Sequence, residues 1–167
     1  MKTLLVLRHA KASPDSASGS DFDRPLTDRG HRASAAVGRH LRASDRRVDV
    51  IVASPATRVL ETVAGLVEGA GMDIAPRWDR RLYNASLAAL IEVVREVDGQ
   101  AGTALIVAHN PGLKELIVHL AEDDPAGLRA RVGGSFPTGA LAELQLEIDD
   151  WRNTGPGCGR IISLVRP

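Results

Sequence analysis

The chain has 167 residues, which is the size of one domain with a substantial hydrophobic core. Its 21 basic residues equal its 21 acidic residues, so the net charge gives no reason to expect a nucleic-acid or membrane-surface binder. One cysteine excludes an internal disulfide and a multi-cysteine metal site, and no stretch approaches the roughly 20 apolar residues of a membrane-spanning helix. We therefore expect a single cytoplasmic domain over residues 1–167.

The first predicted element is a short buried strand. Residues 3–7 form an apolar run that is too short for an ordinary helix and apolar enough for a strand inside a sheet. The run ends abruptly in Arg8 and His9. Residues 10–25 are rich in Ser, Asp, Gly and Pro, which predicts a loop longer than most connections. Since this loop follows His9 directly, it could wall or cover a site there.

Helices and strands are predicted to alternate after this loop. The predicted helices cover residues 28–43 and 55–70, with a third after Ser86 and a fourth after Asn110, and the predicted strands cover 48–53, 74–78 and 103–108. The expected N-caps of the four helices are Thr27, Ser54, Ser86 and Asn110. Proline follows Ser54 and Asn110 directly, at the first helical position, where its missing N–H has no cost.

The C-terminal part of the chain changes character. Residues 121–134 are polar and irregular, with room for a short helix, and residues 140–148 alternate between apolar and polar side chains as a half-exposed strand does. A glycine-rich turn at 155–159 precedes a strand over 160–165 that returns antiparallel. The whole pattern predicts the α/β class, as a three-layer α/β/α sandwich with a mostly parallel central sheet and an antiparallel C-terminal portion.

Residues with catalytic potential follow three of the predicted strands. The first strand ends in Arg8 and His9, the second leads into the turn before Arg58, and the strand over 103–108 is followed by His109. Because the carboxyl ends of parallel strands share one edge of a sheet, we expect these side chains to converge there. Two guanidiniums, two helix N-termini and an imidazole nucleophile describe a phosphoryl-transfer site.

The same segments resemble the histidine phosphatase (phosphoglycerate mutase-like) superfamily. The segments that carry the resemblance are Leu7–Ala10, Arg24–Gly30, Ser54–Thr62 and Ala108–Gly112. The short chain and its Arg-His-Ala-Lys and His-Asn-Pro-Gly variants are similar to the SixA-type phosphohistidine phosphatases. The resemblance implies a nucleophilic His9, phosphate-binding Arg8 and Arg58, and a second catalytic histidine, His109, at the phosphate.

A mechanism for such a site can be argued physically. A neutral His9 attacks phosphorus in line, the leaving group departs, and water hydrolyses the phosphohistidine. Arg8 and Arg58 can each donate paired hydrogen bonds to phosphoryl oxygens, and a protonated His109 adds positive charge. No metal or other cofactor is required, because these cations do the work of a metal ion.

One departure from the family bears on the substrate. Many relatives have a glutamate after the strand that follows the second helix, where it protonates an alkoxide leaving group, but the stretch 78–86 has no glutamate. Imidazole, with a conjugate-acid pKa of about 6.5, leaves a P–N bond far more readily than an alkoxide leaves phosphorus. The missing acid therefore favours phosphohistidine over phosphate esters, although Asp79, or Asp15, Asp21 and Asp23 of the loop, could still supply a proton.

Three functions stay open at this point. The leading hypothesis is a phosphatase acting on phosphohistidine in a partner protein. The alternatives are a phosphomonoesterase for a small metabolite, such as a sugar phosphate or nucleotide, and a catalytically silent phosphate-binding domain. Two secondary residues have two interpretations each: Arg24 either lines the site or pairs with a carboxylate that holds the loop, and Asn110 is a helix cap or a phosphate contact. The sequence indicates no oligomeric state.

Overall fold

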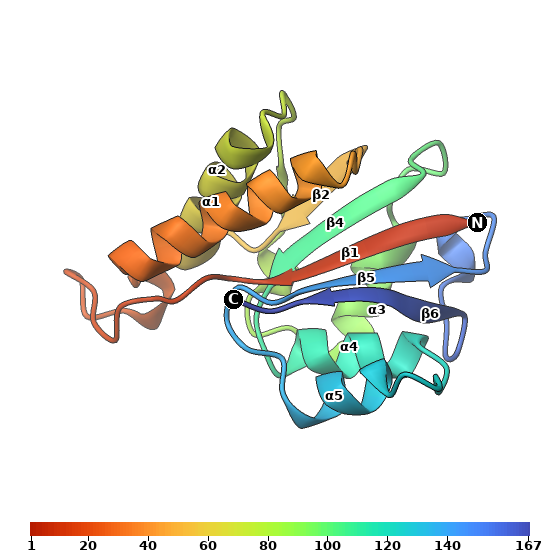
Figure 1. Ribbon diagram of the computed structural model, residues 1–167. Coiled ribbons are helices and arrows are strands. Elements are labelled where there is room, and N and C mark those ends of the chain that lie inside the picture. The colour runs from red at the N-terminus through yellow and green to blue at the C-terminus, as the bar shows by residue number, and fades with distance from the viewer.

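A six-stranded mixed sheet forms the centre of the computed structural model, which describes residues 1–167 (Figure 1). In spatial order the strands are β3 (Arg77–Trp78), β2 (Val50–Ala53), β4 (Thr103–Ala108), β1 (Lys2–Arg8), β5 (Leu141–Leu146) and β6 (Gly159–Val165). The first four are parallel to one another, whereas β5 is antiparallel to β1, and β6 to β5. The predicted fold class, mostly parallel α/β with an antiparallel C-terminal portion, is confirmed.

Helices cover both faces of the sheet (Figure 1). One face carries α1 (Asp28–Ala43) and α2 (Thr57–Ala70), and the other carries α3 (Leu87–Arg95), α4 (Gly112–Leu120) and α5 (Leu128–Gly134). The connections contain three short 3-10 helices, η1 (Asp21–Asp23), η2 (Arg80–Leu82) and η3 (Trp151–Asn153). No helix combines the length and the apolar character needed to cross a membrane.

Strand β1 is buried on both faces, because successive side chains of a strand point to opposite sides of the sheet. Leu5 and Leu7 pack in the core that α1 and α2 cover. Leu4 and Val6 pack in the larger core on the other face. All four side chains are completely buried. The apolar run is therefore a central strand of the sandwich, and it carries the chain to the carboxyl edge of the sheet at Arg8.

Two of the four predicted helix caps are found. The Thr27 hydroxyl accepts a hydrogen bond from the backbone N–H of Gly30 at 3.1 Å, at the start of α1. The Ser86 hydroxyl accepts one from the backbone N–H of Ala89 at 3.2 Å, at the start of α3. Each hydroxyl satisfies a donor that the first turn of a helix leaves unpaired.

The predictions that Ser54 and Asn110 are N-caps are wrong. α2 begins at Thr57 and α4 at Gly112, so each helix starts later than the Ser-Pro or Asn-Pro signature predicts. Each side chain bonds to a group far away in the sequence, described with the site, and the Ser54 hydroxyl also accepts from the backbone N–H of Ala56 at 3.4 Å. The predicted strand over 74–78 is also shorter, because β3 holds only two residues at the sheet edge.

Candidate active site

Two histidines meet at the carboxyl edge of the sheet. β1 and β4 are parallel neighbours, and Arg8 pairs with Ala108 at the ends of the two strands. The residues that follow, His9 and His109, therefore leave the sheet at the same place. Their ring centroids are 5.2 Å apart, with the planes tilted by 55°. Each residue is only 7% exposed, so the two imidazoles face one another in a largely dry environment.

The main chain holds His9 in one tautomer. Its Nδ1 lies 2.8 Å from the carbonyl oxygen of Ala10, and because a carbonyl only accepts, Nδ1 carries the proton and Nε2 the lone pair. Burial lowers the pKa of His9 to about 4, the charges of Arg58, Arg8 and Arg24 act in the same direction, and the Ala10 bond opposes them. At neutral pH His9 is thus an uncharged imidazole, as a nucleophile requires.

A side chain, by contrast, holds His109. Its Nε2 lies 2.8 Å from the hydroxyl oxygen of the completely buried Ser54, and its buried Nδ1 has no hydrogen-bond partner. Burial lowers the pKa of His109 to about 3, and His9 and Arg58 act in the same direction while Asp21 opposes them. His109 is therefore also neutral near pH 7. The protonated form that would add positive charge to the site requires a negative charge, such as that of a phosphate, beside it.

Ser54 is a residue of this cluster that sequence analysis assigned to a helix cap. Its backbone N–H donates to the carbonyl of Val107 at 3.0 Å, which continues the pairing of β2 with β4. This bond places the hydroxyl beside His109, the second residue after Val107. The signal that identifies Ser54 is its position, since it ends a parallel strand at the same edge as the histidine.

Arg58 lies in the first turn of α2 and is 4% exposed. Its Nη1 donates to the backbone carbonyl of Asp21 at 2.7 Å and its Nη2 to the Asp21 carboxylate at 3.1 Å, while its buried Nε has no partner. The Thr62 hydroxyl, one turn further along, donates to the Arg58 carbonyl at 2.6 Å and accepts from the backbone N–H of Ala10 at 3.0 Å. The helix is thereby tied to the segment that follows His9.

Arg8 is held by the segment that precedes β5. Its Nη1 donates to the carbonyl of Phe136 at 3.1 Å, and its buried Nε has no partner. Burial and the positive charge of Arg58 lower the pKa of Arg8, so the two guanidiniums are near enough to repel each other. The amide of Asn110 donates to the same Phe136 carbonyl at 2.7 Å, and its buried Oδ1, the atom that would cap α4, has no hydrogen-bond partner.

The loop of residues 10–25 enters the site through Asp21. Its carboxylate accepts hydrogen bonds from the Tyr83 hydroxyl at 2.8 Å and from Arg24 Nε at 2.9 Å, besides the bond from Arg58. These donors, with Tyr83 first, lower the pKa of Asp21 to about 2. Arg24 also donates to the carbonyl of Ser13 at 2.8 Å, so it pairs with a carboxylate and holds the loop, while its charge still acts on His9.

Comparison with known proteins shows which family the chain belongs to. The sequence model of the histidine phosphatase superfamily (branch 1) matches residues 4–87, about half of the chain. An uncharacterised protein of Mycobacterium tuberculosis is 34% identical over 164 residues, which is 96% of this chain and 99% of that relative. The chain belongs to the histidine phosphatase superfamily.

Solved structures place the chain within this superfamily. SixA from Nakamurella multipartitia has a TM-score of 0.85 and 29% identity, over 99% of this chain and 96% of that one. The protein histidine phosphatase SixA in complex with tungstate shares the fold, with a TM-score of 0.78 and 20% identity over 97% and 95% of the two chains. The protein is a phosphatase of the SixA type.

The aspartates that the sequence offers as proton donors of the phosphatase are bound by arginines or exposed on the loop. Asp79 accepts hydrogen bonds from the backbone N–H and the guanidinium of Arg81, at 3.0 and 2.8 Å, and these bonds lower its pKa. Asp21 is held as a carboxylate by its three donors. Asp15 and Asp23 are exposed on the loop. The lowered pKa values of Asp21 and Asp79 are the opposite of the raised pKa that burial gives a catalytic acid.

A cavity of about 290 Å³ adjoins His109 of the phosphatase at the start of α4, and polar groups of Asn84, Ser86 and Glu115 line it. Sequence analysis missed Glu115 because it sought an acid only after β3 and in the loop of residues 10–25. Its signal is its place in the first turn of a helix that begins at the carboxyl edge of the sheet. No group of three or more His, Cys, Asp or Glu side chains is arranged to hold a metal ion.

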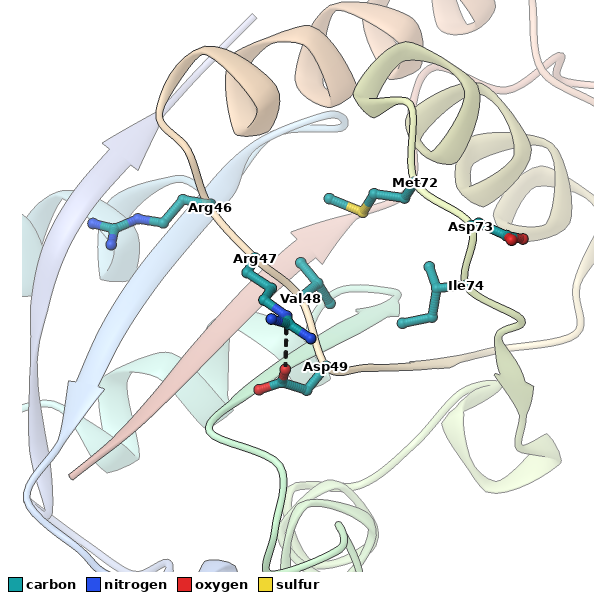
Figure 2. Close-up of a pocket in the computed structure, with 7 residues that line it drawn as sticks. All are labelled: Arg46, Arg47, Val48, Asp49, Met72, Asp73 and Ile74. Atoms are coloured by element: carbon teal, nitrogen blue, oxygen red, sulfur yellow. Dashed lines mark ion pairs between the residues drawn. The ribbon is translucent and has the colours of Figure 1, made fainter.

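Another cavity, of about 350 Å³, lies at the opposite edge of the sheet, between the segments that lead into β2 and β3 (Figure 2). Arg46, Arg47, Asp49 and Met72 are among the residues that line it. Arg47 Nε lies 3.8 Å from the Asp49 carboxylate, and Arg46 pairs with Glu143 at 2.7 Å. These arginines already have carboxylate partners, and the cavity contains none of the predicted site residues of the phosphatase.

Proposed function

We propose that this SixA-type phosphatase removes phosphate from phosphohistidine in a partner protein, without a cofactor, through a covalent phosphohistidine on His9. One observation carries the proposal: the rings of His9 and His109 are 5.2 Å apart, and the charges of Arg8 and Arg58 act on both. A neutral imidazole beside fixed positive charges suits attack on a negatively charged phosphoryl group. The cytoplasmic location expected from the sequence stays a prediction.

In the first step, His9 supplies the nucleophile. The lone pair of Nε2 attacks phosphorus in line, the N–P bond forms, and the leaving group departs with the electron pair of its own bond. Attack leaves positive charge on the ring, which the hydrogen bond from Nδ1 to the Ala10 carbonyl stabilises. Water then attacks phosphorus, the N–P electrons return to Nε2, and the phosphate leaves with both hydrogens of the water.

Arg8 and Arg58 are the proposed ligands of the phosphoryl oxygens. Each guanidinium has a buried Nε without a hydrogen-bond partner, and a guanidinium can donate two parallel bonds to one phosphoryl group. A bound phosphate also favours the protonated form of His109, so we expect the pKa of His109 to rise from its value of about 3 when substrate binds. His109 then adds positive charge where the transition state needs it.

The leaving group decides between the substrate classes. An alkoxide needs a proton donor because its conjugate acid is very weak, whereas an imidazole with a conjugate-acid pKa of about 6.5 leaves far more readily. Asp21 and Asp79 are both held ionised by partners that lower their pKa, which supports phosphohistidine as the substrate. A phosphomonoesterase for a small metabolite is the second candidate, since Glu115 lines the cavity beside His109.

Parallel assays separate the two substrate classes. The protein is given a histidine-phosphorylated phosphotransfer domain and, separately, a panel of sugar phosphates and nucleotides. We expect kcat/KM for phosphohistidine to be higher by roughly two orders of magnitude or more. An ester preferred by the same margin would overturn the substrate assignment.

The variant Glu115→Gln sharpens this assay. Since an imidazole leaving group needs no carboxylic acid, we expect the variant to hydrolyse phosphohistidine within about twofold of the wild-type rate. If the protein is an ester hydrolase that uses Glu115 as its acid, the same variant should lower kcat for esters by a factor of roughly 10² to 10⁴. Exposed Glu92 on α3 provides the matched control, as Glu92→Gln, and neither activity should change.

A further inference from the structure

We propose that Asp21 is a positioning residue of this phosphatase, whose carboxylate holds Arg58 and Tyr83 in one arrangement beside His109. The inference rests on the proposed phosphate-binding role of Arg58 and adds the group that orients it. Side chains from three separate segments, Arg24, Arg58 and Tyr83, donate to this one carboxylate. A loop residue thereby joins α2 to the segment that follows η2.

Asp21 holds Arg58 at both terminal nitrogens. The backbone carbonyl of Asp21 accepts from Nη1 at 2.7 Å, and the carboxylate accepts from Nη2 at 3.1 Å. The side chain of Arg58 is only 5% exposed, and no other carboxylate lies within ion-pair distance of it. Because a buried charge is costly without a partner, Asp21 determines where the guanidinium rests. The Nε of Arg58 has no partner, so the guanidinium keeps one N–H group that can donate to a phosphoryl oxygen.

The same carboxylate orients Tyr83. The Tyr83 hydroxyl donates to Asp21 Oδ2 at 2.8 Å. The ring stands edge-on to His109, with centroids 5.5 Å apart, and edge-on to Phe22 of η1, with centroids 5.0 Å apart. Tyr83 therefore contacts the loop and His109 at once, and the bond to Asp21 fixes its hydroxyl.

The charges around the histidines also depend on Asp21. Three guanidiniums, those of Arg8, Arg24 and Arg58, lower the pKa of His9. The Asp21 carboxylate bonds to two of them and compensates one positive charge. The two positive charges that remain match the two negative charges of a phosphate dianion. The carboxylate also prevents the positively charged neighbours of Arg58 from displacing it by repulsion.

The test compares Asp21→Asn with Asp23→Asn in the full chain. Asp23 lies in the same short helix, but its carboxylate accepts a hydrogen bond only from Ser18, so it controls for changes in the loop itself. The probe substrate is p-nitrophenyl phosphate, whose phenolate leaves without a proton donor. It therefore reports on His9 and Arg58 whichever natural substrate is correct.

We expect Asp21→Asn to lower kcat by about 10- to 100-fold with little change in KM, because a displaced Arg58 costs most in the transition state. Asp23→Asn should stay within about twofold of the wild type. Asp21→Glu, which keeps the charge, should lose less than Asp21→Asn. An Asp21→Asn variant that is unimpaired or faster, or an Asp23→Asn variant with the same loss, would overturn the inference.

A spectroscopic signal tests the contact without any activity. Tyr83 is the one tyrosine of the chain, so the absorbance change on tyrosinate formation reports its ionisation alone. The hydrogen bond to Asp21 raises the pKa of Tyr83. We expect the pKa to fall in Asp21→Asn and to stay raised in Asp23→Asn, with circular dichroism verifying the fold at each pH. An unchanged pKa in Asp21→Asn would overturn the assigned contact.

The wild-type arm separates the two possible failures. A wild-type protein that turns over neither p-nitrophenyl phosphate nor phosphohistidine overturns the proposed function, and the role of Asp21 falls with it. A wild-type protein that is active while Asp21→Asn matches it overturns the role of Asp21 alone.

Discussion

The site has two halves that the chain holds in different ways. The first, the main-chain half, consists of Arg8 and His9. Arg8 donates to the backbone carbonyl of Phe136, and His9 donates to that of Ala10. Backbone carbonyls stay in place whatever side chain their residue carries. This half is therefore determined once β1 and the segment before β5 have folded.

The second, the side-chain half, consists of Arg58 and His109. The Arg58 guanidinium binds the carboxylate of Asp21 in addition to its backbone carbonyl, and the His109 imidazole binds the hydroxyl of Ser54. The carboxylate of Asp21 and the hydroxyl of Ser54 can each be removed by one substitution that leaves the backbone in place. We therefore expect single mutations elsewhere to change the positions of Arg58 and His109 more easily than those of Arg8 and His9.

The largest effect is expected when the nucleophile of the main-chain half, His9, is replaced. His9→Ala should lower kcat by about 10⁴-fold or more, because no other group supplies the attacking lone pair. Radiolabelled phosphate trapped on the wild-type protein should be acid-labile and absent from the variant. His40→Ala, at an exposed position of α1, is the matched control. Label that persists in His9→Ala contradicts the mechanism, and no label on the wild type with any substrate favours a phosphate-binding domain without catalysis.

The next effect compares the two arginines directly. Arg8→Lys and Arg58→Lys should each lower kcat by roughly 10²- to 10³-fold, since lysine cannot donate two parallel bonds. Adding Asp21→Asn to Arg58→Lys should lower kcat/KM little further, because the guanidinium that Asp21 positions is already absent. Adding Asp21→Asn to Arg8→Lys should lower kcat/KM by the same factor as it does in the wild type. Equal costs in the two backgrounds, measured as kcat/KM in a double-mutant cycle, would remove the distinction between the halves.

A third prediction concerns stability against pH. Burial holds the pKa of His9 near 4 and that of His109 near 3, whereas both titrate near 6.5 in the unfolded chain. As pH falls below about 6.5, the two histidines bind protons in the unfolded chain but stay unprotonated in the folded protein. The free energy of unfolding therefore decreases down to about pH 3. The loss should reach about 3 kcal/mol for His9 alone.

Urea unfolding measured between pH 3 and pH 8 tests this dependence. The expected curve is flat above pH 7 and declines towards acid. His9→Gln should remove part of the decline, because glutamine does not titrate. A decline that is the same in the variant would contradict the assignment of the proton uptake to His9.

The smallest effect removes the partner of His109. Ser54→Ala leaves the imidazole Nε2 buried without a hydrogen bond, so the free energy of unfolding should fall by about 1 to 3 kcal/mol. A less well oriented His109 should also lower kcat by about tenfold. Ser44→Ala, at the exposed end of α1, controls for loss of a hydroxyl and should leave both quantities unchanged. A Ser54→Ala variant with wild-type kcat would show that His109 needs no side-chain support.

The sequence determined which residues reach the carboxyl edge of the sheet. Apolar runs at residues 3–7 and 103–108 are typical of buried parallel strands, and parallel strands deliver whatever follows them to one edge. The approach of His9 to His109 is a consequence of this rule. Thr27 and Ser86 were predictable for a local reason, because the N–H group that each hydroxyl caps lies three residues further along the chain.

Only the tertiary structure decided which atoms these residues bind. Ser54 and Asn110 have the local signature of helix caps, yet their partners are His109 and Phe136, which other segments bring within reach. A serine or asparagine side chain bonds to whichever partner is nearest in space, and the folding of distant segments creates that partner. The same holds for the carboxylate of Asp21, which meets the guanidinium of Arg58 because the loop folds back onto α2.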